Sequence, residues 1–300
     1  MKLLIVGSVA YDSVETAAGK VECALGGAAT YASVAASCYT PPGIVAVVGE
    51  DFQGCHLELL RGRGIDLCGL QQVPGKTFHW AGRYLPDMIG RETLATELNV
   101  FERFDPVLPP AYLDAEHVFL ANIHPGLQAR VLDQVKSPKL VVCDTMNLWI
   151  DIARKELEAL LPRVDFLVLN DEEIRMLTGD YNIFRAAKKV MGRTRRGVIV
   201  KRGEHGSTLV CREGMAIAPA YPIEELVDPT GAGDTFAGAL CGYLATAPDL
   251  GLLELKRALM HGAAMASFTV EGFSLDAIRS LSRSDIEGRV ATLRSLTAFD

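Results

Sequence analysis

Short apolar runs recur along the chain, and most of the gaps between them have helical periodicity. The runs span residues 3–6, 44–48, 118–120, 140–142, 166–169 and 198–200. Continuous apolar runs of this length are typical of strands that are buried on both faces of a parallel sheet. Their alternation with helices predicts an α/β fold, in which a doubly wound, mostly parallel sheet is flanked by helices.

The exits of these strands are where functional residues are expected, because ligands of such sheets bind at the carboxyl ends of the strands. This rule selects Asp12, Asp144, Asn170 and the loop 201–206. The second half of the chain has the more regular pattern. Helices are expected there at 171–177, 184–191, 234–245 and 253–269, with a hairpin-like region between 198 and 221.

The composition narrows the class of protein. A net charge of −7, without a compensating basic run, argues against a nucleic-acid surface. The seven cysteines include no Cys-x-x-Cys pair, so neither a zinc site nor a disulfide framework is expected. No apolar run approaches the ~20 residues that a membrane-spanning helix needs. We therefore expect a cytoplasmic protein without membrane contact.

Residues 228–234, Asp-Pro-Thr-Gly-Ala-Gly-Asp, directly precede an apolar, small-residue run that is typical of a buried helix. A turn of this kind leaves the N–H groups of Gly231, Ala232 and Gly233 unpaired at a helix N-terminus, where they attract negative charge. Asp234 would repel an anion there and is better suited to be a base. Amides that hold a phosphoryl group beside a carboxylate that takes a hydroxyl proton are what a kinase requires. The alternative is a tight turn with Asp234 as an N-cap.

A family resemblance rests on this stretch. Residues 228–239, Asp-x-Thr-Gly-Ala-Gly-Asp-Thr-Phe-x-Gly-Ala, closely resemble the signature of the ribokinase (PfkB) family, and the Gly-Gly pair and helix at 26–36 resemble its N-terminal signature. The resemblance implies an ATP-dependent kinase that transfers the γ-phosphate to a hydroxyl of a small sugar or sugar-like polyol. Asp234 would be the general base, and residues 231–233 would stabilise the phosphoryl group.

Five further residues are candidates for contact with the acceptor, besides Asp234. Gly26 and Gly27 would bring backbone N–H groups close to it, although close helix packing also explains the pair. Asp12 matches an Asp of the family that hydrogen-bonds paired hydroxyls, and its alternative role is that of a turn residue. Tyr31 stands where ribokinases proper usually have Asn, which argues against simple ribose. Asn122 follows the run 118–120 and would also face the substrate.

The nucleotide is assigned to two other segments by the resemblance. Asn170 and Glu173 match the family's Asn-x-x-Glu motif, whose Glu helps to place Mg²⁺ and its waters near the phosphates. Asn170 also fits a helix cap whose acidic first turn favours the helix dipole. Lys201, Gly203 and Gly206 resemble the loop along the nucleotide. There Lys201 would meet phosphate charge and Gly203 would admit the ribose.

Three residues complete the expected site. Thr230, within the signature, is assigned to the nucleotide. His261 falls where many relatives have an adenine-contacting Asn, and it fits a core histidine equally well. Asp228 lies in the region where some relatives hold a monovalent cation. The implied cofactors are ATP and Mg²⁺, with K⁺ as an open addition.

Two segments do not fit the α/β alternation, at about 13–25 and about 71–104. Family members carry a small β-sheet lid over the sugar site, and these segments are expected to supply it within one ribokinase-like domain, 1–300. A lid keeps water from the γ-phosphate and so prevents ATP hydrolysis. The alternative is an edge hairpin of the main sheet. A homodimer through the lid is a further option.

The identity of the acceptor stays open between a sugar and a nucleoside. Tyr31, Phe78 and Trp80 suit either a base or a sugar face. This small molecule and ATP are the expected partners. A ligand-binding sensor without phosphotransfer would not need the Gly-Ala-Gly-Asp turn. A dinucleotide-binding oxidoreductase is disfavoured, because Gly7 is not part of a Gly-x-Gly-x-x-Gly motif.

Overall fold

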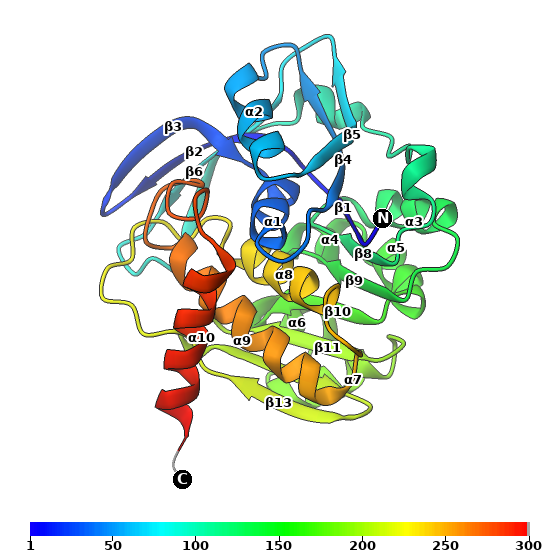
Figure 1. The fold of residues 1–300 in the computed structure, drawn as a ribbon, viewed down its shortest axis with the longest axis vertical. Helices are drawn as coiled ribbons and strands as arrows, with labels where there is room; N and C mark the ends of the chain where they lie inside the picture. Colours follow the sequence, from blue (N-terminus) through cyan, green and yellow to red (C-terminus); the bar gives the residue numbers. More distant parts are fainter. Residues whose placement is uncertain (299–300) are drawn as a thin grey trace.

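Over residues 1–298, which the computed structural model describes, nine strands form one large sheet (Figure 1). Their order is β13-β12-β11-β10-β9-β8-β1-β4-β5, and every neighbouring pair is parallel except the two pairs that include β12. The strands are β1 (Leu3–Val6), β4 (Gly43–Gly49), β5 (Asp66–Val73), β8 (His117–Leu120), β9 (Leu140–Asp144), β10 (Phe166–Asn170), β11 (Gly197–Lys201), β12 (Ser207–Cys211) and β13 (Gly214–Ala218). Each of the six apolar runs lies in one of these strands, so the predicted fold class is confirmed.

Helices cover both faces of the sheet, because successive residues of a buried strand point to opposite faces. Ile5 and Phe119 contribute to a core beneath one helical layer, and their neighbours Leu4 and Leu120 contribute to the core on the other face. The first layer, in front in Figure 1, comprises α1 (Ala28–Ser37), α2 (Gly54–Gly62), α8 (Ala232–Leu244), α9 (Leu252–Thr269) and α10 (Arg283–Thr297). The second comprises α3 (Pro125–Gln134), α4 (Asn147–Ile152), α5 (Arg154–Leu160), α6 (Asp171–Thr178) and α7 (Ile183–Met191).

A second sheet projects from one side of the molecule, at the left in Figure 1. We call it the lid sheet. Its order is β3-β2-β6-β7, with β2 (Ala10–Thr16), β3 (Gly19–Gly26), β6 (Phe78–Tyr84) and β7 (Arg91–Glu97). These strands pair with one another and not with the main sheet over the described residues 1–298, so the prediction of a separate small sheet is confirmed and the edge hairpin is wrong.

The boundaries of the lid sheet differ from the expected ones. β2 begins at Ala10, before the expected residue 13, and residues 71–73 belong to β5 of the main sheet. Asp12 therefore does not simply follow the first strand: it lies within β2 of the lid sheet. The apolar run is the predicted strand β1, but a short connection between β1 and β2 carries Asp12 into a different sheet.

The lid sheet is held to the 227–230 segment by hydrogen bonds. The Thr16 hydroxyl donates to the Val227 carbonyl oxygen at 2.8 Å, and the Thr230 hydroxyl donates to the Tyr84 oxygen at 3.2 Å. The segment that bears the Gly-Ala-Gly-Asp turn is thus in direct contact with the inner side of the lid sheet. This contact brings residues of the two sheets together at one site.

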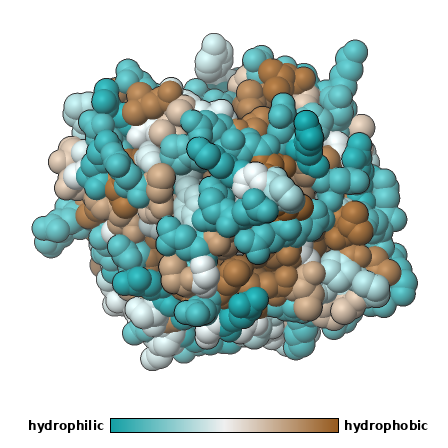
Figure 2. All heavy atoms as spheres, turned by 90° about the horizontal axis from the view of Figure 1, so that it is seen from above, coloured by the Kyte–Doolittle hydropathy of each residue, from teal (hydrophilic) through white to brown (hydrophobic). Residues whose placement is uncertain are grey.

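The outer surface shows no continuous apolar belt in the view from above. Figure 2 shows hydrophilic residues over most of this face, with apolar residues in separate patches. Among the helices of residues 1–298, none is both long and apolar enough to pass through a bilayer.

Candidate active site

The 228–234 turn opens α8, and its geometry follows from glycine. Gly231 has a φ of 77°, and a Cβ there would lie 2.5 Å from the Tyr31 ring. Only glycine tolerates both this backbone conformation and this close approach. Tyr31, which is 1% exposed, therefore packs against the turn. Its ring lies against the protein, although it was expected to contact the acceptor.

The turn leaves amide donors free at the helix N-terminus. Within residues 1–298, the N–H groups of Gly231, Gly233 and Asp234 have no hydrogen-bond acceptor, whereas that of Ala232 donates to the Pro229 carbonyl at 3.2 Å. The expected set of 231–233 is therefore shifted: the Ala232 amide is engaged, and the Asp234 amide is free. Free N–H groups at the positive end of a helix dipole form an anion site.

Helices α1 and α8 cross closely, which brings the two signature segments together. A Cβ on Gly238 would lie 2.3 Å from the Ala32 carbonyl oxygen, so small residues at this crossing are required. Gly27 caps α1 with a φ of 93°, and a Cβ there would lie 2.6 Å from the Ser8 carbonyl oxygen. These contacts favour the packing alternative for Gly26 and Gly27, and the expected approach to the acceptor stays a prediction.

Asp12 lies against the same glycine pair. A Cβ on Gly26 would lie 2.0 Å from the Asp12 carboxylate, so residue 26 has to be glycine. Burial raises the pKa of Asp12 to about 7; the Gly27 N–H lowers it, and the nearby Asp228 and Asp234 raise it. Asp12 therefore faces the acids of the 228–234 turn, although it comes from another sheet.

Asp234 is partly buried at the start of α8. Burial raises its pKa to about 7, the Asp144 carboxylate raises it further, and Lys201 and Arg91 lower it. A carboxylate with a pKa near the working pH is suited to accept a proton and to release it again. The environment of Asp234 is that of a tuned base rather than of an exposed helix cap.

Lys201 lies at the centre of a group of carboxylates. Its Nζ is 3.0 Å from Oδ2 of Asp144, and the two side chains are 19% and 3% exposed. Burial would lower the pKa of Lys201, but the carboxylates of Asp144, Glu173 and Asp234 outweigh burial and raise it. A Cβ on Gly233 would lie 2.9 Å from the Lys201 Nζ, so the ammonium lies beside the anion site. This position of the ammonium beside the anion site is consistent with the prediction that Lys201 contacts a phosphate group of the nucleotide.

Glu173 and Asn170 form a capping box at the start of α6. The Asn170 N–H donates to Oε2 of Glu173 at 2.7 Å, and the Glu173 N–H donates to Oδ1 of Asn170 at 2.8 Å. The pKa of Glu173 is raised to about 7, mainly by burial and also by the Asp144 carboxylate. Lys201, the Asn170 N–H and Arg91 act in the opposite direction and lower it. Two buried carboxylates beside a single ammonium fit a divalent cation that keeps most of its waters. Capping and metal placement are compatible here.

The other expected nucleotide residues differ in their surroundings. Gly203 has a φ of 53° with open space around it, which is compatible with a nearby ligand. Gly206 has a φ of 77°, and a Cβ there would lie 2.1 Å from the Ala218 carbonyl oxygen, so the hairpin itself requires this glycine. Thr230 donates its N–H to Asp228 and its hydroxyl to Tyr84, which orders the turn.

His261 and Asn122 are engaged by neighbouring side chains. The His261 ring stacks on Tyr243 at 4.4 Å between ring centroids, and its Nδ1 is 3.1 Å from the Tyr39 hydroxyl. Burial lowers the pKa of His261 to about 4, as for a neutral core histidine. Asn122 accepts a hydrogen bond from Trp149 Nε1 at 2.8 Å and donates to the Met146 sulfur at 3.1 Å. These contacts favour the core alternative for His261.

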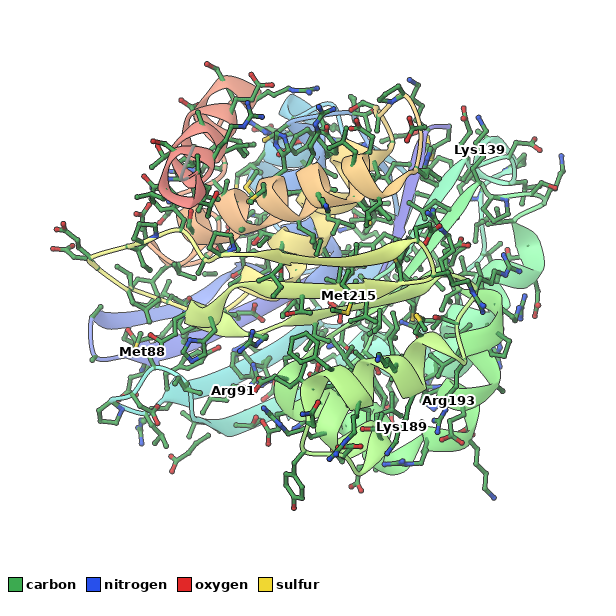
Figure 3. All side chains as sticks on the ribbon, turned by 90° about the horizontal axis from the view of Figure 1, so that it is seen from below. Met88, Arg91, Lys139, Lys189, Arg193 and Met215 are labelled. Atoms are coloured by element: carbon green, nitrogen blue, oxygen red, sulfur yellow. The ribbon has the colours of Figure 1, made fainter. Side chains whose placement is uncertain are left out.

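Arg91 is a residue that the sequence analysis did not select. It opens β7 of the lid sheet (Figure 3). Its guanidinium lies 5.7 Å from the centre of the Trp80 ring. Its charge lowers the pKa of both Glu173 and Asp234. No motif marks it, because it is a single arginine in an irregular segment whose strand pairing only the fold reveals.

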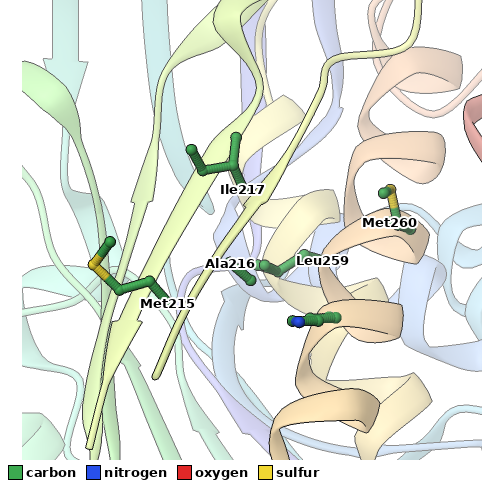
Figure 4. A pocket seen from close by; sticks show the side chains of 6 residues that line it. Met215, Ala216, Ile217, Leu259 and Met260 are labelled. Atoms are coloured by element: carbon green, nitrogen blue, oxygen red, sulfur yellow. The ribbon is translucent and has the colours of Figure 1, made fainter. Parts of the chain in front are cut away.

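A separate hollow lies between β13 and α9, away from these acids. Its volume is about 460 Å³, and it is lined by Met215, Ala216, Ile217, Lys256, Leu259 and Met260 (Figure 4). None of the residues expected in the site lines it.

Comparisons with known proteins agree with this arrangement. Residues 2–279 match the family described as pfkB family carbohydrate kinase. The chain is 32% identical over 250 residues to the cytidine kinase of Thermococcus kodakarensis, covering 81% of this chain and 88% of that protein. It is 29% identical over 303 residues to the nucleoside kinase of Methanothermobacter thermautotrophicus, covering 90% and 89%.

Solved structures share the fold. The nucleoside kinase of Methanocaldococcus jannaschii superposes with a TM-score of 0.79 at 19% identity, covering 97% of this chain and 99% of that chain. A ribokinase II structure from E. coli in complex with ATP and Mg²⁺ superposes with a TM-score of 0.81 at 20% identity, covering 97% and 99%.

Proposed function

Because this chain belongs to the pfkB family of carbohydrate kinases, which phosphorylate an alcohol group with ATP, we propose that Asp234 is its catalytic base. The observation that carries this proposal is a carboxylate with a pKa near 7 beside three free amide N–H groups at the start of α8. Asp234 takes the proton of the acceptor hydroxyl as the oxygen attacks the γ-phosphate. The amides of Gly231, Gly233 and Asp234 stabilise the charge on the phosphoryl group.

Mg²⁺ fits beside Glu173 and Asp144. Both carboxylates are buried and have raised pKa values, and the ammonium of Lys201 is paired with Asp144 and lowers the pKa of Glu173. Glu173 would hold the ion through water, and the bound ion would neutralise phosphate charge. The Lys201 ammonium, beside Gly233, adds a fixed positive charge on the same side of the turn.

We propose that the acceptor is the sugar of a nucleoside. Asp12 suits two neighbouring hydroxyls, and it lies directly opposite Trp80 in the β2–β6 ladder. Directly opposite residues point to the same face of a sheet, so an aromatic face adjoins the hydroxyl-binding carboxylate. Two relatives whose alignments cover more than four fifths of both chains are named cytidine kinase and nucleoside kinase, which supports the same choice.

A panel of nucleosides and free sugars tests this choice. We expect ADP release that depends on a pyrimidine or purine nucleoside and is much weaker with ribose or other free sugars. The control is Asp234→Asn, in which acceptor-dependent ADP release should be at least about 10²-fold slower with every member of the panel. Turnover with free sugars but with no nucleoside would refute the proposal that the acceptor is a nucleoside. A nucleoside that raises the melting temperature without any turnover would identify a sensor and refute the kinase.

We further propose that Asp228 binds a monovalent cation. Its Oδ1 accepts the Thr230 N–H at 2.8 Å, whereas its buried Oδ2 has no hydrogen-bond partner within residues 1–298. Burial raises the pKa of the Asp228 carboxyl. The Ser274 N–H is near enough to lower this pKa, but it does not form a hydrogen bond with Oδ2. A buried carboxylate oxygen without a donor favours a cation.

Potassium dependence tests the Asp228 site. We expect severalfold faster turnover in KCl than in choline chloride at equal ionic strength, because a bound cation would fix the carbonyls next to the anion turn. The Asp228→Asn variant should lose this difference. Equal rates in the two salts would contradict the proposal.

We also propose that two copies associate through the lid sheet. Strands β3 and β7 are its free edges, and unpaired edges of a sheet favour pairing with another chain.

A further inference from the structure

Arg91 is a cation of the lid sheet that no carboxylate holds. Within residues 1–298, no acidic side chain lies within ion-pair distance of it, although the lid sheet has other ion pairs, such as Arg83 with Glu15. Its guanidinium lies over the Trp80 ring. An arginine that rests on an aromatic face keeps its N–H donors free for a ligand.

The face of the lid sheet on which Arg91 lies can be established from the strand register. Arg91 is directly opposite Tyr84 in the β6–β7 ladder, so both side chains point to one face. The Tyr84 oxygen accepts the Thr230 hydroxyl, so this face meets the anion turn. The Trp80 ring covers Gly82, where a Cβ would lie 2.3 Å from it, and the Arg91 guanidinium lies over the ring. Arg91 therefore lies on the inner face.

The charges at the site call for a further cation when phosphate is bound. Four carboxylates follow one another through the site: Asp12 is near Asp234, Asp234 is near Asp144, and Asp144 is near Glu173. Lys201 compensates them but is already paired with Asp144. Arg91 is near enough to stabilise the charged forms of Glu173 and Asp234. A nucleoside triphosphate adds further negative charge there, and Arg91, without an ion-pair partner among residues 1–298, has donors free to meet it on the lid side.

We propose that Arg91 binds the terminal phosphate of the nucleotide and holds it against the amides of the 231–234 turn. The planar guanidinium fork matches two phosphate oxygens, which an ammonium cannot do. When no nucleotide is bound, the side chain rests on Trp80. This inference depends on the proposed function, because it assumes that the γ-phosphate lies at that turn.

Nucleotide affinity of the free enzyme tests the inference without any turnover. Titration calorimetry of Arg91→Gln should show ATP binding weaker by about tenfold or more, with a smaller loss for ADP and none for AMP. The matched control is Arg83→Gln: Arg83 is on the same hairpin, next to Tyr84 and therefore on the opposite face, where it pairs with Glu15. Unchanged ATP affinity in Arg91→Gln, or equal losses in both variants, would overturn the role.

The pH profile gives a second readout that a purely structural role would not change. The groups that face Asp234 are Asp12, Asp144, Lys201 and Arg91, with Glu173 beside Lys201. Removing the Arg91 charge should move the acid limb of kcat/KM to higher pH, whereas Arg91→Lys keeps the charge and should leave the limb near that of the wild type. If the acid limb of the kcat/KM profile does not move in Arg91→Gln, the guanidinium of Arg91 does not lie close to Asp234.

The two proposals can fail separately. If Asp234→Asn is inactive and Arg91→Gln binds ATP like the wild type, the Arg91 inference is wrong and the catalytic base stands. If Arg91→Gln binds ATP weakly and Asp234→Asn keeps full turnover, the Arg91 contact stands and the base is wrong.

Discussion

Replacing Asp234 with Asn will lower turnover by about 10²- to 10⁴-fold, which is the usual contribution of a general base. Asn has nearly the same shape as Asp but cannot take the proton of the acceptor hydroxyl. ATP affinity should be unchanged or slightly tighter, because one negative charge leaves the neighbourhood of the phosphates. Steady-state kinetics and titration calorimetry on the same preparation measure both quantities. Unchanged turnover would remove Asp234 from the mechanism.

The pH profile of the wild type belongs to the same prediction. Burial first, and Asp144 second, raise the pKa of Asp234 to about 7, so the base is charged above that pH and protonated below it. Turnover should therefore rise as the pH increases through about 7. Asp12 and Glu173 have pKa values of about 7 as well, so the limb reports the group of acids rather than one residue. A flat profile between pH 5 and 8 would contradict this account.

A matched control separates the base from a helix cap. Asp249 precedes α9, is exposed, and accepts the Gly251 N–H at 2.7 Å. Asp249→Asn changes a carboxylate near a helix N-terminus without touching the site. It should keep wild-type turnover and the wild-type pH profile. A similar loss in both variants would mean that Asp234 acts through the stability of α8.

Residues whose role depends on local structure could be predicted from the sequence. Buried strands have continuous apolar runs, so the parallel sheet and its strand exits were found. Gly231 was found because a turn with a positive φ at a helix start needs glycine. Asn170 and Glu173 were found through the Asn-x-x-Glu motif, whose spacing of three residues is also that of the capping box they form.

Residues whose role depends on strand pairing could not be found in this way. Asp12 and Arg91 reach the site only because β2, β6 and β7 form a separate sheet that packs on the 227–230 segment. Asp144 and Lys201 each follow a predicted strand, yet their ion pair depends on β9 and β11 flanking β10. The periodicity of a sequence shows which face of a helix or strand is buried, but it does not show which other elements lie beside it.

Replacing Lys201 with Met will destabilise the fold by about 3–5 kcal/mol near pH 8, as expected when one partner of a buried ion pair is removed. Met keeps most of the aliphatic stem, so the loss is mainly that of the charge. Asp144, which is 3% exposed, would be left uncompensated beside Glu173. Urea unfolding at fixed temperature measures the free energy of unfolding of this variant and of the wild type.

The loss should depend on pH in a definite direction. The pKa of Lys201 is raised above its ordinary value of 10.5, so its stabilising charge is present at all pH values between 5 and 9. Burial raises the pKa of Asp144 even with Lys201 present, and removal of Lys201 raises it further. A carboxyl group whose pKa is higher in the folded than in the unfolded protein does not lower the free energy of unfolding at a pH below both pKa values. As the pH rises from the unfolded towards the folded pKa, it lowers that free energy increasingly. The deficit should shrink towards pH 5.

A double variant tests whether the buried charge is the cause. In Lys201→Met with Asp144→Asn, the uncompensated carboxylate is absent, so much of the stability should return. The matched control is Lys189→Met, because Lys189 pairs with Asp180 on the surface and its side chain is 49% exposed. It should change the free energy of unfolding by well under about 1 kcal/mol. The same deficit at pH 8 and pH 5, or no recovery in the double variant, would show that Lys201 stabilises by packing and not by charge.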